Sequence, residues 1–207
     1  MSEPRSIAER VEEVVPGVWR WTIAHDERIG GAETDAHAVV TDDGAVLIDP
    51  LPLAPEALER LGRVEAICLT AACHQRSSWR LRQELGVSVH APRGAKTLAQ
   101  EPDASYEDGD ALPGDLRAVY TPGPESAHYS FLLERGPRVL FCSDLLTHYP
   151  GRALEFVPLH YHDDPEATKR SVRGLLELGF DVLCLDHGSP ITQSPHSAIR
   201  GFLERAG

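Results

Sequence analysis

Short apolar runs in the first part of the chain predict a β-rich opening. Residues 18–23 and 36–41 have the apolar and β-branched composition of strands. Asp42, Asp43 and Gly44 then supply a turn into a third strand over residues 45–49. The pattern therefore predicts that the last two of these strands form a hairpin.

The pattern then changes to alternating helices and strands. Residues 54–61 predict a short helix that stops at Gly62, and residues 65–70 return to a strand. Residues 76–85 predict a second helix, and a further strand follows over residues 87–90. A strand, helix and strand in this order form a crossover, so we expect these strands to be parallel.

The middle of the chain predicts a loop followed by a second hairpin. Residues 100–114 are rich in Asp, Glu, Pro and Gly and predict a surface loop with at most a short strand around Tyr106. A strand over 116–121 precedes a hairpin over 128–134 and 138–144. Both hairpins end in an aspartate, which suggests a molecule built from two related halves.

The C-terminal part predicts a helix, a strand and a final helix. Asp164 and Pro165 are a typical helix start, and the helix is expected to end near Gly179. Residues 181–186 form an apolar strand, and Ser194 begins the last helix. Because no Ser/Gly-rich linker divides the chain, we expect one domain over residues 1–207.

Composition and charge narrow the function classes. The chain has 20 Lys and Arg against 32 Asp and Glu, a formal balance of −12, and it is 42% hydrophobic. This acidic balance disfavours nucleic acids and anionic membranes as partners. The start of the chain is charged, no segment is long and apolar enough to span a membrane, and three of the four cysteines lie in apolar runs. We therefore expect a reduced, cytoplasmic protein.

Polar residues follow several of the predicted strands. The loop after Thr70 reads AACHQR, the loop after Phe141 contains SDLLTH, the loop after Leu185 reads DHGSP, and residues 121–128 leave a strand in the same manner. Ligands bind at the carboxyl ends of strands in α/β sheets because loops converge there. These loops are the candidate site.

Six segments in order resemble the metallo-β-lactamase superfamily. They are VVPGVWRW, AVLIDP, LTAACHQRSS, TPGPESAHYSFLL, FCSDLL and DHGSPI. The resemblance implies an α/β fold, the αββα sandwich of two mixed β-sheets flanked by helices. It also implies a hydrolase-like protein of unknown substrate.

The resemblance also places the family's metal ligands, and most are changed. The HxHxDH motif falls on Ala71, Cys73, Gln75 and Arg76, and the histidine that follows Thr-Pro-Gly in the family is Pro124. Only Asp144 and His187 match metal ligands of the family. Zinc needs three or four N, O or S donors, so these two residues do not hold the usual dinuclear site.

Two arrangements of the remaining residues are open. In the first, Arg76 pairs with Asp144 and takes the place of a lost metal, with no cofactor bound. In the second, Asp144 and His187 hold one zinc, iron or manganese ion with His74, His128 or Cys73.

The other histidines have less specific interpretations. We expect His74 to turn outward or to bond to backbone at a helix start, and His128 to face either the cleft or solvent. A surface loop is favoured over a lid for His148, His160 and His162. The loops 100–114 and 147–164 would shape any pocket.

Three functions follow from these alternatives. The favoured one is a catalytically silent member whose cleft binds a small molecule or partner, with Arg76, Asp144 and His187 in a metal-free polar network. The alternative is a divergent hydrolase of an ester, thioester, lactone or phosphoester that uses one metal. Metal-free catalysis by His74, His128 or Cys73 is the third, although no triad is recognisable. A homodimer is compatible with a domain of this class.

Overall fold

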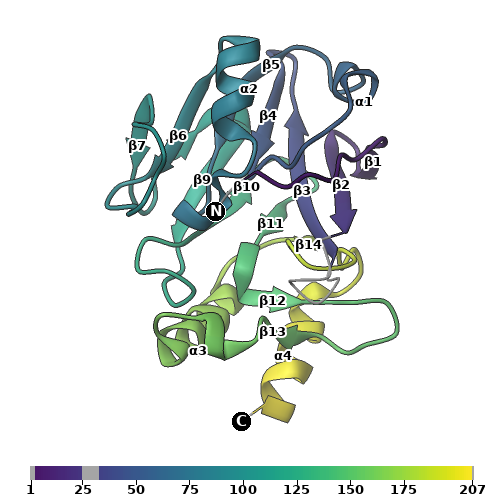
Figure 1. Cartoon of the computed structure of the whole chain (residues 1–207). Helices are drawn as coiled ribbons and strands as arrows, with labels where there is room; N and C mark the ends of the chain where they lie inside the picture. Colours follow the sequence, from purple (N-terminus) through teal and green to yellow (C-terminus); the bar gives the residue numbers. More distant parts are fainter. Residues whose placement is uncertain (1–2, 25–32, 207) are drawn as a thin grey trace.

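The computed structural model describes residues 3–24 and 33–206, and its strands form two large mixed sheets (Figure 1). The first sheet has seven strands in the order β1 to β7. They are β1 Glu12–Val15, β2 Val18–Ala24, β3 Glu33–Val40, β4 Ala45–Ile48, β5 Val64–Cys68, β6 Ser88–Pro92 and β7 Ala104–Tyr106. Strands β1 to β4 pair antiparallel, and β4 to β7 pair parallel.

The second sheet has five strands in the order β14-β11-β10-β9-β8. They are β8 Ala111–Leu112, β9 Leu116–Tyr120, β10 Tyr129–Leu133, β11 Val139–Phe141 and β14 Val182–Cys184. Strands β10 and β11 form an antiparallel hairpin, and β11 pairs parallel with β14. In both sheets, therefore, a hairpin is followed by a strand that pairs parallel with its second strand. In the first sheet these strands are β3, β4 and β5.

Alternation along the strands explains why the two sheets stack. In β4, Val46 and Ile48 pack between the sheets, whereas Leu47 faces the helices of the first sheet. In β10, Phe131 packs between the sheets and Leu132 faces the opposite way. Successive side chains of a strand point to opposite faces, so each sheet buries both of its faces.

Helices cover the two outer faces. Helices α1 Pro55–Glu59 and α2 Ser78–Leu85 pack on the first sheet, and α3 Pro165–Gly174 and α4 Pro195–Ala206 lie with the second (Figure 1). The predicted αββα sandwich is therefore confirmed. No helix within residues 3–24 and 33–206 is long and apolar enough to cross a membrane.

The predicted elements agree with the structure except at their ends and in short pieces. The crossover from β5 through α2 to β6 is parallel as expected, and both hairpins are present. Helix α3 begins after Asp164, whose Oδ1 accepts from the Ala167 N–H at 2.9 Å. Strand β1 was not predicted, nor was the pair β12 Leu146–Thr147 and β13 Glu155–Phe156, which lies largely within the expected 147–164 loop.

Backbone hydrogen bonds bring the ends of four strands together. The Asp49 N–H donates to Cys68 O at 3.1 Å, and the Cys142 N–H donates to Cys184 O at 3.0 Å. Between the sheets, the Asp35 N–H donates to Asp186 O at 2.7 Å. The polar segments that follow β4, β5, β11 and β14 therefore meet at one place.

Candidate functional site

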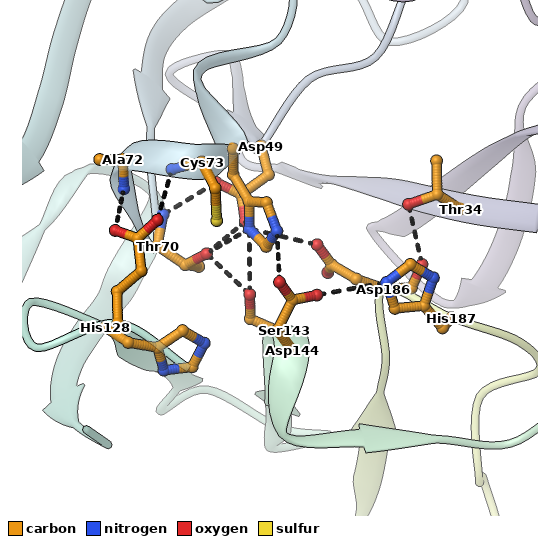
Figure 2. Close-up of polar contacts among 12 residues, drawn as sticks. Thr34, Asp49, Thr70, Ala72, Cys73, His128, Ser143, Asp144, Asp186 and His187 are labelled. Carbon is orange, nitrogen blue, oxygen red and sulfur yellow. Dashed lines mark hydrogen bonds and ion pairs between the residues drawn. The ribbon is translucent and has the colours of Figure 1, made fainter. Parts of the chain in front are cut away.

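A buried polar network lies where these strand ends meet (Figure 2). We define the network as eight residues: Asp49, Thr70, His74, Arg76, Ser143, Asp144, Asp186 and His187. They come from the segments that follow β4, β5, β11 and β14. The sequence named five candidates: Arg76, His74, His128, Asp144 and His187. The structure brings four of them together in the network, and His128 lies outside it.

His74 is the centre of the network. It belongs to the short 3₁₀ helix Ala72–Gln75, and only 4% of its side chain is exposed. Its Nδ1 lies 3.1 Å from Asp49 Oδ2, and its Nε2 lies 3.0 Å from Asp144 Oδ2. The expectation that His74 turns outward or bonds to backbone is therefore wrong, because its ring joins two carboxylates from different sheets.

Arg76 is buried in the same network. Its Nη2 donates to Asp186 Oδ2 at 3.1 Å and to Thr34 Oγ1 at 3.3 Å. Its Nη1 donates to the backbone carbonyls of Asp35 and Asp49, both at 3.0 Å. These four bonds hold Arg76 at a φ of 31°, an uncommon backbone conformation for a residue with a side chain.

The expected pairing of Arg76 with Asp144 is wrong. The guanidinium of Arg76 instead pairs with Asp186, which follows β14, the neighbour of β11 in the second sheet. Asp144 is instead bonded to two histidines, because His187 Nε2 lies 3.2 Å from its Oδ1 while His74 contacts its Oδ2. Arg76 therefore compensates a different aspartate from the one that the sequence suggested.

Asp49, which follows β4, orders the loop after β5. Its carboxylate accepts from the Thr70 N–H at 2.8 Å and from Thr70 Oγ1 at 2.5 Å. Since the Thr70 hydroxyl proton points to Asp49, Ser143 Oγ donates to Thr70 Oγ1 at 2.8 Å. These bonds fix the loop that carries His74 against the loop that carries Asp144.

The geometry favours the protonated form of both network histidines. Both ring nitrogens of His74 face carboxylates, and His187 contacts Glu33 O at 3.1 Å through Nδ1 and Asp144 through Nε2. Burial alone would lower the pKa of His74, but Asp144 and other neighbouring groups outweigh it and raise that pKa well above its usual value. The pKa of His187 is raised in the same way.

The carboxylates respond to these cations. Burial tends to raise the pKa of Asp144, yet His74 and His187 hold it well below the usual range. For Asp186, burial is the stronger influence, so its pKa is raised despite the contact with Arg76. The network is therefore a set of internal ion pairs in which protein cations neutralise buried carboxylates.

Cys73 and Glu125 lie at the edge of the network. Glu125 accepts from the Ala72 N–H at 3.1 Å and from the Cys73 N–H at 2.9 Å, so it caps the 3₁₀ helix. Burial raises the pKa of the Cys73 thiol to about 11 despite the nearby His74. A thiol that stays protonated is a weak nucleophile, so the arrangement does not favour thiol catalysis.

The remaining histidines differ in their burial and contacts. His128 is buried and its ring is turned toward the Asp144 side of the network (Figure 2). His162 is also buried, so its expected place in a surface loop is wrong. His160 is exposed, and His148 is partly exposed with Nδ1 2.9 Å from Ser189 O.

Some residues at the motif positions have other contacts. Ala71 is fully buried and has no side-chain donor atom. The amide of Gln75 binds Trp79 Nε1, the Ala99 N–H and Thr97 O. Among residues 3–24 and 33–206, two sets of three side chains could each offer ligand atoms to a metal ion. The first set is Cys73, His74 and Asp144, and the second is Asp49, His74 and Asp186. Within each set the ligand atoms lie within 4.8 Å of one another.

The sequence did not single out several members of the site. Asp186 precedes His187 in the DHGSPI segment, and Glu125 lies in the TPGPESAH segment, so both were inside loops already named. Thr70 and Ser143 precede the expected ligand positions. Only the spatial arrangement shows that these side chains complete the hydrogen bonds of the network.

Comparisons with known proteins agree with this fold. A family model described as the metallo-beta-lactamase superfamily matches residues 13–193. The DIM-1 metallo-beta-lactamase superposes with a TM-score of 0.74 at 15% identity, covering 96% of this chain and 98% of that chain. A metallo-beta-lactamase from Pontibacter korlensis gives 0.74 at 19% identity, covering 94% and 98%.

A third solved structure gives the same result. A metallo-beta-lactamase from Erythrobacter litoralis superposes with a TM-score of 0.74 at 16% identity, covering 94% of this chain and 96% of that chain. A comparison with curated protein sequences finds no match. The family model spans most of the chain, and the order of the strands and helices agrees with it. The chain therefore belongs to the metallo-beta-lactamase superfamily.

Proposed function

We propose that this chain does not assemble the two-metal centre of its superfamily and acts as a ligand-binding member rather than a hydrolase. The observation that supports this most directly is the position of His74 and Arg76. Their cationic side chains lie against Asp49, Asp144 and Asp186, the carboxylates that would otherwise be free to attract metal ions.

The donor set argues against two zinc ions. The resemblance assigns ligand positions to Ala71 and Pro124, whose side chains offer no donor atom, and to Arg76, which is a permanent cation. Gln75 uses its amide to bind Trp79, Ala99 and Thr97. The residues present therefore do not fit the pair of zinc ions that the family implies.

Charge supports the same conclusion. A divalent ion beside Asp144 would lie close to the imidazolium of His74 and to that of His187. Binding it would first require those rings to release protons that the carboxylates stabilise. The internal cations thus do structurally what a metal does in a metalloprotein: they neutralise buried carboxylates and join the two sheets.

The exposed edge of the network is where a ligand would bind. The side chains of Asp144 and His187 are 19% and 18% exposed, whereas Asp49 is fully buried. We propose a small molecule as the ligand. The excess of acidic residues disfavours nucleic acid.

One observation favours a second candidate, a hydrolase with a single metal. The donor atoms of Cys73, His74 and Asp144 lie within 4.8 Å of one another, and thiolate, imidazole and carboxylate all bind zinc. This arrangement would require His74 to release the proton on Nε2 and to exchange its bond with Asp144 for a bond to the metal.

Metal content measured on untagged protein tests both candidates. Plasma mass spectrometry would be applied to the natural chain and to Asp144→Ala, His187→Ala and Cys73→Ser. Asp42→Ala is the matched control, because Asp42 is exposed in the turn at the opposite end of β3 and β4.

The proposal expects far less than one ion per chain in every sample. One ion per chain that is lost in Cys73→Ser and Asp144→Ala and retained in Asp42→Ala would establish the single-metal candidate instead. Two ions per chain would contradict both candidates.

A further inference from the structure

A pocket outside the network lies between the ends of β6 and β7 in the first sheet and the β9–β10 pair in the second. Its volume is about 440 Å³, which is within the range of small-molecule sites. None of the eight network residues is among the described residues that line it. Its polar and aromatic lining consists of Arg93, Glu107, Asp108, Tyr120, Ser126 and Tyr129.

Tyr129 offers an unused hydroxyl to this pocket. Only 6% of the residue is exposed, yet its hydroxyl makes no hydrogen bond to residues 3–24 and 33–206 and is accessible from the pocket. Burial, Tyr120 and Asp108 raise the pKa of this hydroxyl, so it keeps its proton at neutral pH. The Tyr129 hydroxyl can therefore both donate and accept a hydrogen bond.

Tyr120 supplies a fixed aromatic surface beside that hydroxyl. It pairs directly with Tyr129 across β9 and β10, and the two ring centroids are 5.3 Å apart. The Tyr120 hydroxyl donates to Ser126 O at 3.0 Å, while 46% of the residue remains exposed. An exposed aromatic ring of this kind attracts apolar groups and cations.

Asp108 is held next to Tyr120 and leaves the pocket with negative charge. Its Oδ1 accepts from the Tyr120 N–H at 2.7 Å. The described residues contain no ion pair of Asp108 or Asp110, whereas Glu107 pairs with Arg93 at 2.6 Å and so offsets that cation. These carboxylates are not among the sets whose ligand atoms come within 4.8 Å of one another, so they do not form a metal site.

We propose that this pocket binds an organic ammonium ion with an aromatic body. The ammonium N–H groups donate to the Asp108 carboxylate and to Oη of Tyr129, and the aromatic body packs on Tyr120. An anion would be repelled by Asp108, and Arg93 is already paired with Glu107. The pocket is separate from the network, so the inference goes beyond the proposed function and does not depend on it.

NMR of the tyrosine rings tests the inference on the full chain, with 2-phenylethylammonium as the probe. The five tyrosines would be labelled with ¹³C in their rings. We expect the signals of Tyr120 and Tyr129 to shift with a dissociation constant of about 1 mM. Tyr161, which is 70% exposed and lies outside the pocket, is the internal control. The absence of a shift at Tyr120 and Tyr129, or an equal shift at Tyr161, would overturn the proposal.

Three related compounds test the ligand class on the natural chain. The compound 2-phenylethanol has the same aromatic body without the charge, 3-phenylpropanoate has the opposite charge, and methylammonium has no aromatic body. Each should bind at least ~10-fold more weakly than 2-phenylethylammonium, because each loses one of the two interactions or reverses the charge. Equal binding of any of the three would contradict the proposed class, even if no variant folds.

Asp108→Asn tests the role of the carboxylate. The amide oxygen of asparagine can still accept from the Tyr120 N–H, so the turn is kept while the charge is removed. We expect the affinity for 2-phenylethylammonium to fall at least ~10-fold. Asp181→Asn is the matched control, because Asp181 is also exposed and accepts a backbone N–H, that of Arg138 at 3.0 Å. An unchanged affinity in Asp108→Asn, or an equal loss in the control, would overturn the proposal.

Tyr129→Phe tests the hydroxyl while the ring keeps its packing against Tyr106, whose centroid lies 5.1 Å away. Affinity for 2-phenylethylammonium should fall about 5-fold, the effect of one lost hydrogen bond. Affinity for its N,N,N-trimethyl derivative, which has no N–H, should not change. An equal change for the two compounds would contradict the proposed contact. Metal content of the network does not enter any of these outcomes, so this inference and the proposed function can fail separately.

Discussion

The inner and outer parts of the network differ in how completely their groups are paired. We call Asp49, Arg76 and Asp186 the inner group and Asp144, His187 and Cys73 the outer group, with His74 between them. Every inner side chain is nearly inaccessible to water, and the four hydrogen bonds of Arg76 all end on protein atoms. The outer side chains are partly exposed.

This difference indicates that the inner group stabilises the fold and that the outer group is available to a ligand. A buried charge without its partner is strongly destabilising, so the inner group cannot exchange partners without cost. The outer group can exchange a protein contact for a contact with water or a ligand at lower cost. On the proposed function, the absence of a metal centre would be compensated in the inner group, and the outer group would remain available to a ligand.

Arg76→Met should have the largest effect, because it removes the cation of the inner group. Asp186 would lose its ion pair, and the carbonyls of Asp35 and Asp49 would lose their donors. Breaking a buried pair in this way costs about 3–5 kcal/mol of the free energy of unfolding. Urea denaturation of the natural chain and of the variant measures this loss in the free energy of unfolding.

Arg80→Met is the matched control for this prediction. Arg80 lies in α2 with 39% of its side chain exposed and pairs with Glu3 and Glu84. An exposed pair of this kind contributes about 1 kcal/mol or less. Equal losses in the two variants would contradict the distinction between a buried and an exposed arginine.

Lowering the pH should change the stability contribution of the neutral histidines differently from that of the histidines paired with aspartates. Burial lowers the pKa of His37 to about 3 and that of His128 to about 4. Their contribution to stability is complete above the unfolded pKa of about 6.5 and is lost as the pH falls toward the folded values. His74 has the opposite sign, since its raised pKa keeps its contribution until the pH rises through the folded value.

The free energy of unfolding should therefore fall between pH 6.5 and pH 4. Each neutral histidine contributes a slope of at most about 1.4 kcal/mol per pH unit, and the raised pKa of Asp186 offsets part of it. His37→Phe should reduce the slope, because His37 packs edge-on against Phe141 and an apolar ring fits there. An unchanged slope in this variant would show that His37 is not the titrating group. Denaturation at a series of pH values provides the data.

The sequence predicted the layers better than the contacts within the site. Apolar runs such as that of β4 show which strands are buried on both faces, and the hairpin turns are local, so the two sheets could be inferred. The loops that carry chemistry could also be named, because they follow strand ends. Strand β1 was not predicted because it is only four residues long and its sequence, EEVV, does not alternate apolar and polar positions.

The pairings inside the site depend on contacts between distant segments. His74 lies 25 residues from Asp49 and 70 from Asp144 along the chain, so nothing local indicates that its ring joins them. For Arg76 the sequence suggested Asp144 alone. Its contact with Asp186 accompanies a positive φ and hydrogen bonds to two carbonyls of the first sheet, which the sequence does not show. Such choices are made by tertiary structure rather than by residue type.

His187→Ala should have the smallest effect and would sharpen the comparison from the outer side. The ring is partly exposed, Asp144 keeps its contact with His74, and water can replace the lost donor. We therefore expect a loss of about 1 kcal/mol or less in the free energy of unfolding. Combining it with Asp144→Asn in a double-mutant cycle should give a coupling energy below about 1 kcal/mol. A cost as large as that of Arg76→Met would mean that the outer group is also structural, and the ligand would then have to bind elsewhere.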